Sequence, residues 1–319
     1  MTSRRALGIA LVLVSAFGFG SGALFSKPIY AAGVGWLVLS AWRFGLGAAL
    51  SWAWLLASRD RRAGLRRLDR RSAGVAIALG VLFTANSATY FAGLETVSAS
   101  LAALLVYIYP ALVAVLSLRF GRRLEGPRAW AALGLALGGV VLAVGGIDPG
   151  EAPAADGLVL ILASPVFYAI WIILSARLSG ERQGSVGDDV DAGTDAAAAT
   201  ALMTTATAVT YWTLTIGSGT PVLPADVPPA AWPGLIGVGA FSTFVAIQAF
   251  YAGAQRLGAA QAALISTVEP IWTISLAALL LAERLEPMQL VGGTLILGGV
   301  VLAQTARGAT RPPVRLADE

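Results

Sequence analysis

The 319-residue sequence contains no cysteine and no histidine, and it is poor in charge. Without cysteine there is no disulfide framework and no thiolate chemistry. Without histidine the chain lacks the commonest general base and metal ligand, which leaves most enzyme mechanisms short of a required group. Charged residues make up 13% of the chain and hydrophobic residues 57%, whereas a soluble domain is about a quarter charged. Together with a mean hydropathy of +0.75, this composition indicates a membrane protein.

Lysine is also nearly absent, since Lys27 is the only one and the rest of the 22 basic residues are arginines. Nearly all the arginines lie in short stretches between apolar runs, a pattern typical of membrane topology rather than of a polyanion-binding face. No nucleic-acid partner is therefore expected, despite a pI of about 9.8. The arginine-rich stretch 59–71 is expected to contact anionic membrane lipid.

Ten apolar runs are each long enough to cross a bilayer, which takes about 20 helical residues. They cover 6–29, 34–57, 73–94, 98–120, 129–147, 157–178, 196–217, 231–254, 258–282 and 287–306. Continuous runs favour helices over a barrel, because a barrel strand alternates over about ten residues. The first run is too long for a signal peptide and is interpreted as a retained helix. The predicted fold class is an all-α polytopic membrane protein with ten transmembrane helices.

The distribution of arginine predicts the orientation of these helices. With the N-terminus in the cytoplasm, the cytoplasmic stretches hold nearly all the arginines, and the outside loops hold only Arg284. Both termini, including the tail 307–319, are therefore predicted to be cytoplasmic. The expected location is the inner (plasma) membrane of the cell, crossed many times.

A long internal repeat divides the chain in two. The segment "YFAGLETVSASLAALLVYIYPALVAV" from Tyr90 aligns with "FYAGAQRLGAAQAALISTVEPIWTIS" from Phe250, so that Pro110 matches Pro270. At the same offset "GGVVLA" at 138 recurs at 298. Each half has five runs, and an odd number means that the second half enters the membrane from the opposite side. The prediction is a pair of inverted five-helix repeats, 1–150 and 151–306, a construction common in alternating-access transporters. A duplication retained only for folding is the alternative.

Three stretches make the chain resemble the drug/metabolite transporter (DMT) superfamily, EamA type. They are "AGLETVSASLAALL", "STVEPIWTISLAALLLAERLEPMQLVGGTLILGGVVL" and the first-half echo "YPALVAVLSLRFGRRLEGPRAWAALGLALGGVVL". The resemblance implies a ten-helix permease or exporter of small metabolites that works by alternating access. It also implies a central cavity built mainly by helices 1, 3, 4, 6, 8 and 9. The first half departs from the second in having Tyr109 where the second has Glu269.

Glu269 lies near the middle of the ninth run, where a charge costs about 2.5–3.5 kcal/mol. It should therefore face the bundle or water rather than lipid. Pro270 cannot donate to the carbonyl of Ser266, which leaves an acceptor beside the carboxyl. Ser266 and Glu269 also share one helix face. Solute binding and proton coupling by Glu269 are the functional interpretations, and a hydrogen bond that fixes helix 9 to a neighbour is the structural one.

Other polar and aromatic residues are candidates for the cavity wall. In the sixth run Tyr168 and Trp171 lie on one stripe with Ser164 and Ser175, and they either contact solute or pack helices. Asn86 and Gln248 should point inward, because an unbonded amide in lipid is costly. The predicted substrate-binding set is Glu269, Tyr168, Trp171, Asn86, Gln248, Tyr109, Tyr90, Ser266 and Trp272, and Pro110 and Pro270 are the predicted helix breaks. Tyr107 and Tyr109 fall on different helix faces, so at most one of them is expected to line a cavity.

Two basic residues lie inside predicted helices. Arg43 and Lys27 could hold an anionic group or pair with Glu269, but snorkelling to the interface is the preferred interpretation for both. The acidic residues Asp188, Asp189, Asp191 and Asp195 are interpreted as a solvated linker rather than a metal site. No metal, cofactor or catalytic residue is predicted.

The sequence therefore predicts a secondary transporter that exports or exchanges small amphipathic metabolites such as amino acids, with protons as a candidate coupling ion. A non-transporting membrane scaffold or regulator remains an alternative, although midplane polar groups count against it. An intramembrane enzyme would need a nucleophile–base pair or a metal cluster, and none is evident. The sequence leaves open whether the protein is a monomer or a homodimer.

Overall fold

The computed structural model describes residues 3–118, 127–147, 152–178, 196–257, 262 and 265–306, which are helical and contain no β-strand. Helices dominate because in hydrocarbon each backbone N–H and C=O must be bonded within its own segment. In chain order the helices are α1 (Ser3–Gly20), α2 (Gly22–Ala31), α3 (Trp36–Leu56), α4 (Arg59–Arg67), α5 (Arg70–Leu94), α6 (Ala99–Val106), α7 (Tyr109–Leu118), α8 (Pro127–Gly145), α9 (Ala155–Leu178), α10 (Ala196–Gly217), η2 (Pro229–Ala231), α11 (Trp232–Gly239), η3 (Ala240–Val245), α12 (Ala246–Leu257), α14 (Val268–Leu280) and α15 (Pro287–Ala306).

Four helical stretches are long and apolar enough to cross a membrane: Arg4–Ala31, Arg70–Leu94, Ala155–Leu174 and Pro229–Leu257. Shorter apolar helices cover part of four further predicted runs: Ala99–Val113, Trp130–Gly145, Val268–Leu280 and Pro287–Leu302. The two remaining predicted runs coincide with α3 and α10, of 21 and 22 residues. Several apolar helices of this kind define a polytopic membrane protein.

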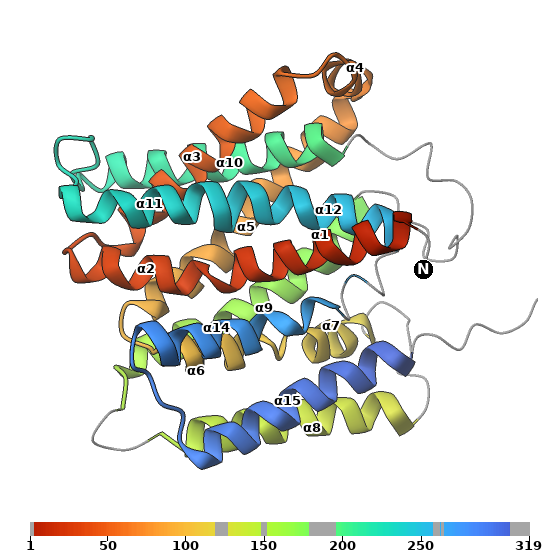
Figure 1. Ribbon diagram of the computed structural model, residues 1–319, viewed down its shortest axis with the longest axis vertical. Helices are drawn as coiled ribbons and strands as arrows, with labels where there is room; N and C mark the ends of the chain where they lie inside the picture. The colour runs from red at the N-terminus through yellow and green to blue at the C-terminus, as the bar shows by residue number, and fades with distance from the viewer. Residues whose placement is uncertain are drawn as a thin grey trace, which may run out of the picture.

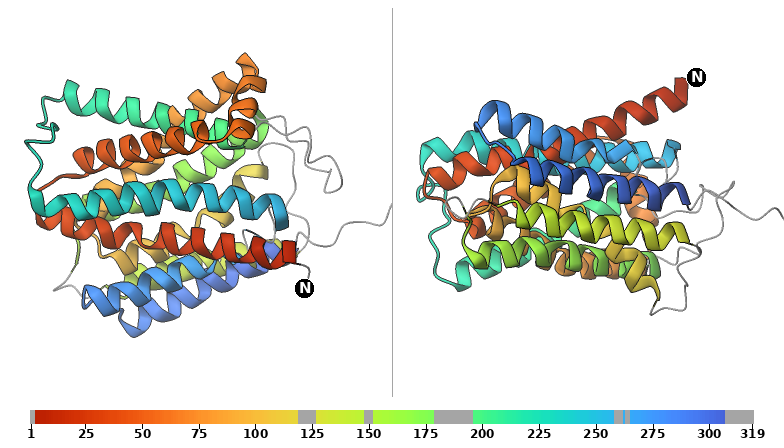
Figure 2. Two further views of the ribbon diagram at one scale, coloured as in Figure 1. Left: turned by 45° about the horizontal axis from the view of Figure 1, so that its top comes forward. Right: turned by 90° about the horizontal axis from the view of Figure 1, so that it is seen from below.

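The main helices run side by side along roughly one direction (Figures 1 and 2). The most extensive packing pairs α8 with α15, α3 with α10, α5 with α9 and α1 with α12. Each of these pairs joins a helix from the first half of the chain to one from the second. The main hydrophobic core likewise combines Leu39 and Leu105 with Ile161 and Leu235. The main core is therefore shared between the halves, although a smaller cluster around Ile108, Ala111 and Ala136 lies within the first half.

Glycines allow the closest of these helix contacts. A Cβ built on Gly93 of α5 would lie 2.7 Å from the carbonyl oxygen of Gly157 in α9. One built on Gly253 of α12 would lie 3.0 Å from the carbonyl oxygen of Gly8 in α1. Such contacts let the backbones approach closely, which is a major source of helix association in membranes.

The arginine-rich segment forms its own short helix, α4, at one end of the bundle. The N-terminal end of α1 and the C-terminal end of α12 lie at that same end, while the α2–α3 and α10–α11 connections lie at the other (Figure 1). Arg61 of α4 donates to the carbonyl of Trp54 at 2.9 Å, and its guanidinium lies 4.0 Å from the centroid of that indole ring. The helix is thereby held against the end of α3.

Several predicted runs are interrupted rather than continuous. The run 98–120 is divided into α6 and α7 at Tyr107–Ile108, immediately before Tyr109 and Pro110. In the second half, a turn at Thr267 precedes α14, in which Pro270 is the third residue. Proline cannot donate the helical hydrogen bond to the residue four positions earlier, so the preceding turn loses a bond at both places. The run 231–254 contains the π-helical turn η3, a feature that often marks functional sites.

Candidate functional site

Glu269 lies in the first turn of α14 and is bonded to the first half of the chain. The Tyr107 hydroxyl is 3.0 Å from Oε2 of Glu269 and 2.8 Å from the carbonyl oxygen of Ser266. That carbonyl is the acceptor that Pro270 leaves without its helical donor. Tyr107 is 5% exposed, whereas Ser266 and Glu269 are half-buried. The break before α7 and the break before α14 thus meet at one carboxyl group.

This geometry is sensitive to the presence of a proton. A tyrosine hydroxyl has one hydrogen to donate, but here it faces two acceptors, the Ser266 carbonyl and the Glu269 carboxyl. If the carboxyl is protonated, it can donate to Tyr107, which in turn donates to Ser266, and all three groups are bonded. If the carboxyl is ionised, Tyr107 has to divide one hydrogen between two acceptors. Gain or loss of a proton therefore changes the hydrogen bonding between α14 and the α6–α7 junction.

A row of aromatic rings extends from Tyr107 across α7 and α9. The ring centroids of Tyr107 and Tyr109 are 5.9 Å apart, those of Tyr109 and Tyr168 4.8 Å, and those of Tyr168 and Trp171 5.9 Å. Phe83 of α5 ends the row 5.4 Å from Trp171. Both Tyr107 and Tyr109 belong to this cluster, and the prediction that at most one of them lines a cavity stays a prediction. The helix break between them changes the directions that a continuous helix would impose.

The polar groups of this row are used differently. The Trp171 indole N–H donates to the carbonyl of Leu79 at 2.9 Å, which fixes α9 to α5. The hydroxyls of Tyr109 and Tyr168 make no hydrogen bond within the part of the chain that the structure describes, and both side chains are half-buried. Of the row, therefore, these two hydroxyls are available to another molecule.

Two α5 residues lie close to this group. Asn86 accepts from the Ser164 hydroxyl of α9 through its Oδ1 at 2.9 Å, so its amide is already used in helix packing. Tyr90 is half-buried, and its hydroxyl makes no hydrogen bond among the described residues. It interacts electrostatically with Glu269, Arg43 and Glu283.

Other predicted site residues make contacts elsewhere. The Gln248 amide of α12 donates to the Thr200 hydroxyl of α10 at 3.2 Å. The Trp272 indole N–H donates to the Ser21 hydroxyl at 3.1 Å, and its ring lies 4.5 Å from that of Phe17. These bonds hold α12 to α10 and α14 to the α1–α2 junction. The side chain of Ser175, the acidic linker 188–195 and the tail 307–319 lie outside what the structure describes.

The two intramembrane cations do not behave as snorkelling residues. Arg43 is only 8% exposed, and its Nε donates to the Thr243 hydroxyl of η3 at 2.8 Å. The snorkelling interpretation is wrong for Arg43, because the π-helical turn and the core of the bundle enclose it. Lys27 is half-buried, and its Nζ donates to the carbonyls of Leu94 and Val97 at 2.8 and 2.6 Å. It therefore caps the end of α5 rather than reaching for water.

Sequence reasoning missed three partners in this part of the molecule. Tyr107 was not assigned to Glu269, although the free Ser266 carbonyl signalled that a donor was needed. Thr243 carries no recognisable sequence signal, because the π-helical turn is what brings its hydroxyl within hydrogen-bond distance of Arg43. Glu283 accepts from the backbone N–H groups of Ala99 and Ser100, both at 2.9 Å, and thus caps α6 from the other half.

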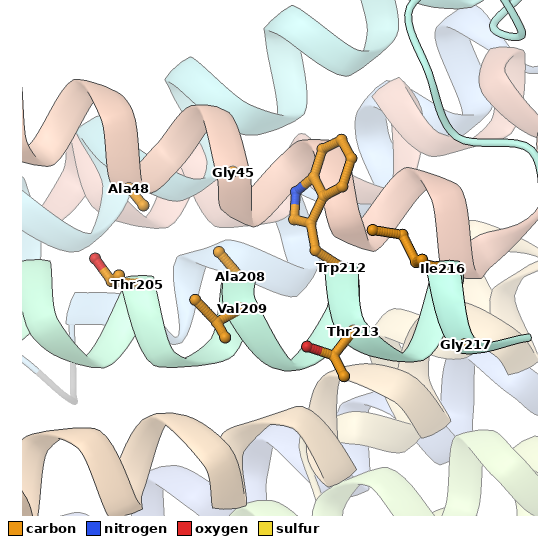
Figure 3. Close-up of a pocket in the computed structure, with 9 residues that line it drawn as sticks. All are labelled: Gly45, Ala48, Thr205, Ala208, Val209, Trp212, Thr213, Ile216 and Gly217. Atoms are coloured by element: carbon orange, nitrogen blue, oxygen red, sulfur yellow. The ribbon is translucent and has the colours of Figure 1, made fainter.

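A groove of about 600 Å³ lies between α3 and α10 and contains none of the predicted site residues. Figure 3 shows Trp212 of α10 directed toward α3, with Gly45 and Ala48 opposite. The groove is lined almost wholly by apolar groups, and its wall residues Val209 and Ile216 are 59% and 63% exposed. It is a surface feature, separate from the Glu269 group. Among the described residues, no cluster of acidic side chains could hold a metal ion.

The helical bundle defines a polytopic membrane protein, and the comparisons with known proteins give its class as transporter. The EamA-like transporter family matches the chain twice, over residues 6–145 and 155–305. The chain therefore belongs to the EamA-like transporter family, which points to a transporter rather than an enzyme.

Two further similarities support this assignment. A protein of Archaeoglobus fulgidus described as an uncharacterized transporter is 26% identical over 230 residues, which cover 71% of this chain and 75% of that protein. A solved crystal structure covers 94% of this chain and 96% of its own, with a TM-score of 0.64 and 19% identity. At that identity the structural likeness supports the fold alone.

Proposed function

We propose that this protein is a secondary transporter that exports or exchanges small amphipathic metabolites, amino acids among them, by alternating access. The observation that carries the proposal is the bond between Glu269 and Tyr107, which joins the two halves at their helix breaks. An acidic residue at membrane depth is costly and generally functional. Here it touches an aromatic row with free hydroxyls, a suitable surface for a solute that is partly apolar and partly polar.

The proposed architecture is ten membrane crossings arranged as inverted repeats, 1–150 and 151–306. In the repeat, α5 of the first half corresponds to α12 of the second, and α1 of the first half corresponds to α9 of the second. The α5–α9 contact is therefore the counterpart of the α12–α1 contact, and both contacts occur. The glycines in these contacts, Gly93 and Gly253, are also 160 residues apart, the offset of the sequence repeat. Gly93 lies near the end of α5 that is away from α4, whereas Gly253 lies near the end of α12 that is at the same end of the bundle as α4 (Figure 1). This opposition supports inversion.

The proposed orientation places both termini in the cytoplasm of a cell whose inner membrane holds the protein. It is supported by the arrangement of the arginines, since α4 and the first turns of α1 lie at the same end of the bundle (Figure 1). Positive residues favour the cytoplasmic side, where α4 would also contact anionic lipid headgroups.

Transport itself is tested with purified protein. A thermal-shift screen against a panel of small metabolites would select solutes that bind, and counterflow into proteoliposomes would then show whether they move. We expect a bound solute to exchange across the membrane at a rate well above that of protein-free vesicles. Binding without exchange would favour a scaffold or regulator instead.

Proton coupling is proposed for Glu269, because only this carboxyl controls the hydrogen bond between α14 and the α6–α7 junction. Glu269→Gln should keep solute exchange at equal pH but lose transport driven by a pH gradient, since the amide cannot release a proton. Glu95→Gln is the control, because Glu95 accepts from the backbone N–H of Trp36 at the exposed end of α3. Unchanged pH-driven transport by Glu269→Gln would exclude coupling through this residue.

A further inference from the structure

We propose that Arg43 is the residue that binds the carboxylate of the transported solute. The inference rests on the proposed transport function and adds a chemical class of ligand to it. Arg43 is one of the few charged side chains inside the bundle, 8% exposed, and it has no carboxylate partner among the described residues. A buried cation without a counter-charge loses its hydration and gains little in return. In membrane proteins such residues mark solute pathways.

The guanidinium is held by one edge only. Its Nε–H donates to the Thr243 hydroxyl at 2.8 Å, and that hydroxyl donates in turn to the carbonyl of Val238 at 2.9 Å within the π-helical turn. The ring centroids of Phe44 and Phe91 lie 5.0 and 4.5 Å from the guanidinium carbon. These contacts fix the guanidinium and leave its two terminal nitrogens without a hydrogen bond in the described chain. Two parallel N–H groups in that position match a carboxylate.

The side chains that interact electrostatically with the guanidinium carry neutral hydroxyl groups. Its electrostatic neighbours are the tyrosines Tyr30, Tyr90 and Tyr211. Ser40 and Ser87 lie beside the Tyr211 hydroxyl, but their own hydroxyls are buried and do not reach hydrogen-bond geometry with any described residue. Unbonded buried hydroxyls are costly and call for a partner. The Tyr30 and Tyr211 hydroxyls already donate to the carbonyls of Phe91 and Thr84, whereas the Tyr90 hydroxyl makes no hydrogen bond among the described residues. Of the three tyrosines, Tyr90 is therefore the one whose hydroxyl is open to an anion.

Tyr90 relates this group to the Glu269 site, because it interacts electrostatically with both Arg43 and Glu269. Arg43 belongs to the first half of the chain and its ligand Thr243 to the second. A carboxylate bound here would therefore contact the junction between halves that alternating access has to rearrange.

The test is the melting temperature of the purified protein in detergent with matched pairs of probes. Acetate is compared with acetamide, benzoate with benzamide, and 3-phenylpropanoate with its amide, all at one ionic strength. We expect at least one carboxylate to raise the melting temperature where its amide does not. Arg43→Gln should abolish this difference, and Arg43→Lys should weaken the apparent affinity about tenfold, because a lysine ammonium lacks the bidentate fork.

Thr243→Val provides a variant that keeps the charge but removes the tether of Nε, and it should also weaken the carboxylate preference. It serves as the deciding variant if Arg43→Gln does not fold. Two results with the unmodified protein would overturn the proposal: equal rises in melting temperature with acids and amides, or no rise with any carboxylate. A carboxylate preference that survives in Arg43→Gln, or that is unaffected in Thr243→Val, would also overturn it. If chloride raised the melting temperature as much as the carboxylates do, the site would be assigned to a small inorganic anion instead. Because the readout is binding, its failure would leave the transport assay to judge the transporter proposal separately.

Discussion

At the scale of the residue, the Glu269–Tyr107 contact links chemistry to helix geometry. Pro270 removes a donor from the Ser266 carbonyl, Tyr107 replaces it, and the same hydroxyl reaches the carboxyl. The proline would otherwise leave a buried carbonyl without a partner, at a cost of about 1–3 kcal/mol. One side chain thus satisfies a structural need and connects it to an ionisable group.

Tyr107→Phe should lower the free energy of unfolding by about 1–3 kcal/mol, because the Ser266 carbonyl and the Glu269 carboxyl both lose their hydrogen-bond partner. It should also alter the pH dependence of solute exchange. Both are measurable by thermal unfolding in detergent and by counterflow at several pH values. Tyr109→Phe is the matched control, since the Tyr109 hydroxyl makes no hydrogen bond among the described residues. Equal destabilisation by the two variants would contradict this account.

Tyr168 and Trp171 allow packing and binding to be separated within one aromatic pair. Trp171→Phe should lower stability by about 1 kcal/mol, because it deletes the hydrogen bond to the Leu79 carbonyl. Tyr168→Phe keeps the ring and loses a free hydroxyl, so stability should hold while solute affinity falls. Melting temperatures with and without a solute from the metabolite screen would show this. If Tyr168→Phe left affinity unchanged, its hydroxyl would have no role in binding.

At the scale of the element, glycine placement decides which helices touch. The motif "GGVVLA" occurs in α8 and α15, and in each copy the first glycine is open while the second is tightly packed. A Cβ on Gly138 or Gly298 would meet nothing within 4 Å, but one on Gly139 would lie 2.5 Å from the Gly292 carbonyl oxygen. One on Gly299 would lie 2.6 Å from the Ala132 carbonyl oxygen. The two helices therefore cross at backbone contact.

Gly139→Ala should separate α8 from α15 and destabilise the protein by about 1–3 kcal/mol, the usual cost of overpacking. Gly138→Ala, one residue earlier, should be neutral or stabilising by up to about 1 kcal/mol, because alanine is the better helix former. Thermal unfolding of the two single variants gives the comparison. A loss of stability in Gly138→Ala as large as in Gly139→Ala would show that the crossing is not the cause.

At the scale of the whole molecule, the interleaving of the halves couples the ends of the bundle to its centre. Glu283 caps α6 across the halves, and Lys27 caps α5 where it leads into α6. Both caps lie in the same region, at the end of the bundle opposite α4. A movement of one half relative to the other therefore has either to break these hydrogen bonds or to move the bonded groups together. The orientation of the bundle then decides which side of the membrane these caps face.

The orientation is testable because the chain has no cysteine. Ala57→Cys and Ala225→Cys introduce single thiols at exposed positions, one between α3 and α4 and one between α10 and α11. In intact cells a membrane-impermeant maleimide should label Ala225→Cys at once, and Ala57→Cys only after permeabilisation. The reverse pattern would invert the proposed topology, and the unmodified chain serves as the blank.

Much of this protein could be predicted from its sequence alone. Hydropathy, a local property, locates the apolar helices, and the offset between Pro110 and Pro270 locates matching breaks in two of them. The resemblance carried by "STVEPIWTIS" and its neighbours is confirmed by the family match over both halves. The sequence also identifies Glu269 as an unusual charge within a membrane helix. Placing an acidic residue at the bilayer centre costs free energy whichever helices pack around it, so the sequence alone reveals it.

Only the tertiary structure decided which groups surround these charges. Tyr107 and Glu269 are 162 residues apart in the chain, and Arg43 and Thr243 are 200 apart. Contacts of this kind depend on how helices of opposite halves pack, and on local breaks that rotate side chains away from ideal helical directions. A helical-wheel argument assumes a continuous helix, so it separated Tyr107 from Tyr109 and gave no reason for Arg43 to remain buried. The π-helical turn at Thr243 and the break at Tyr107 are the features that overrule it.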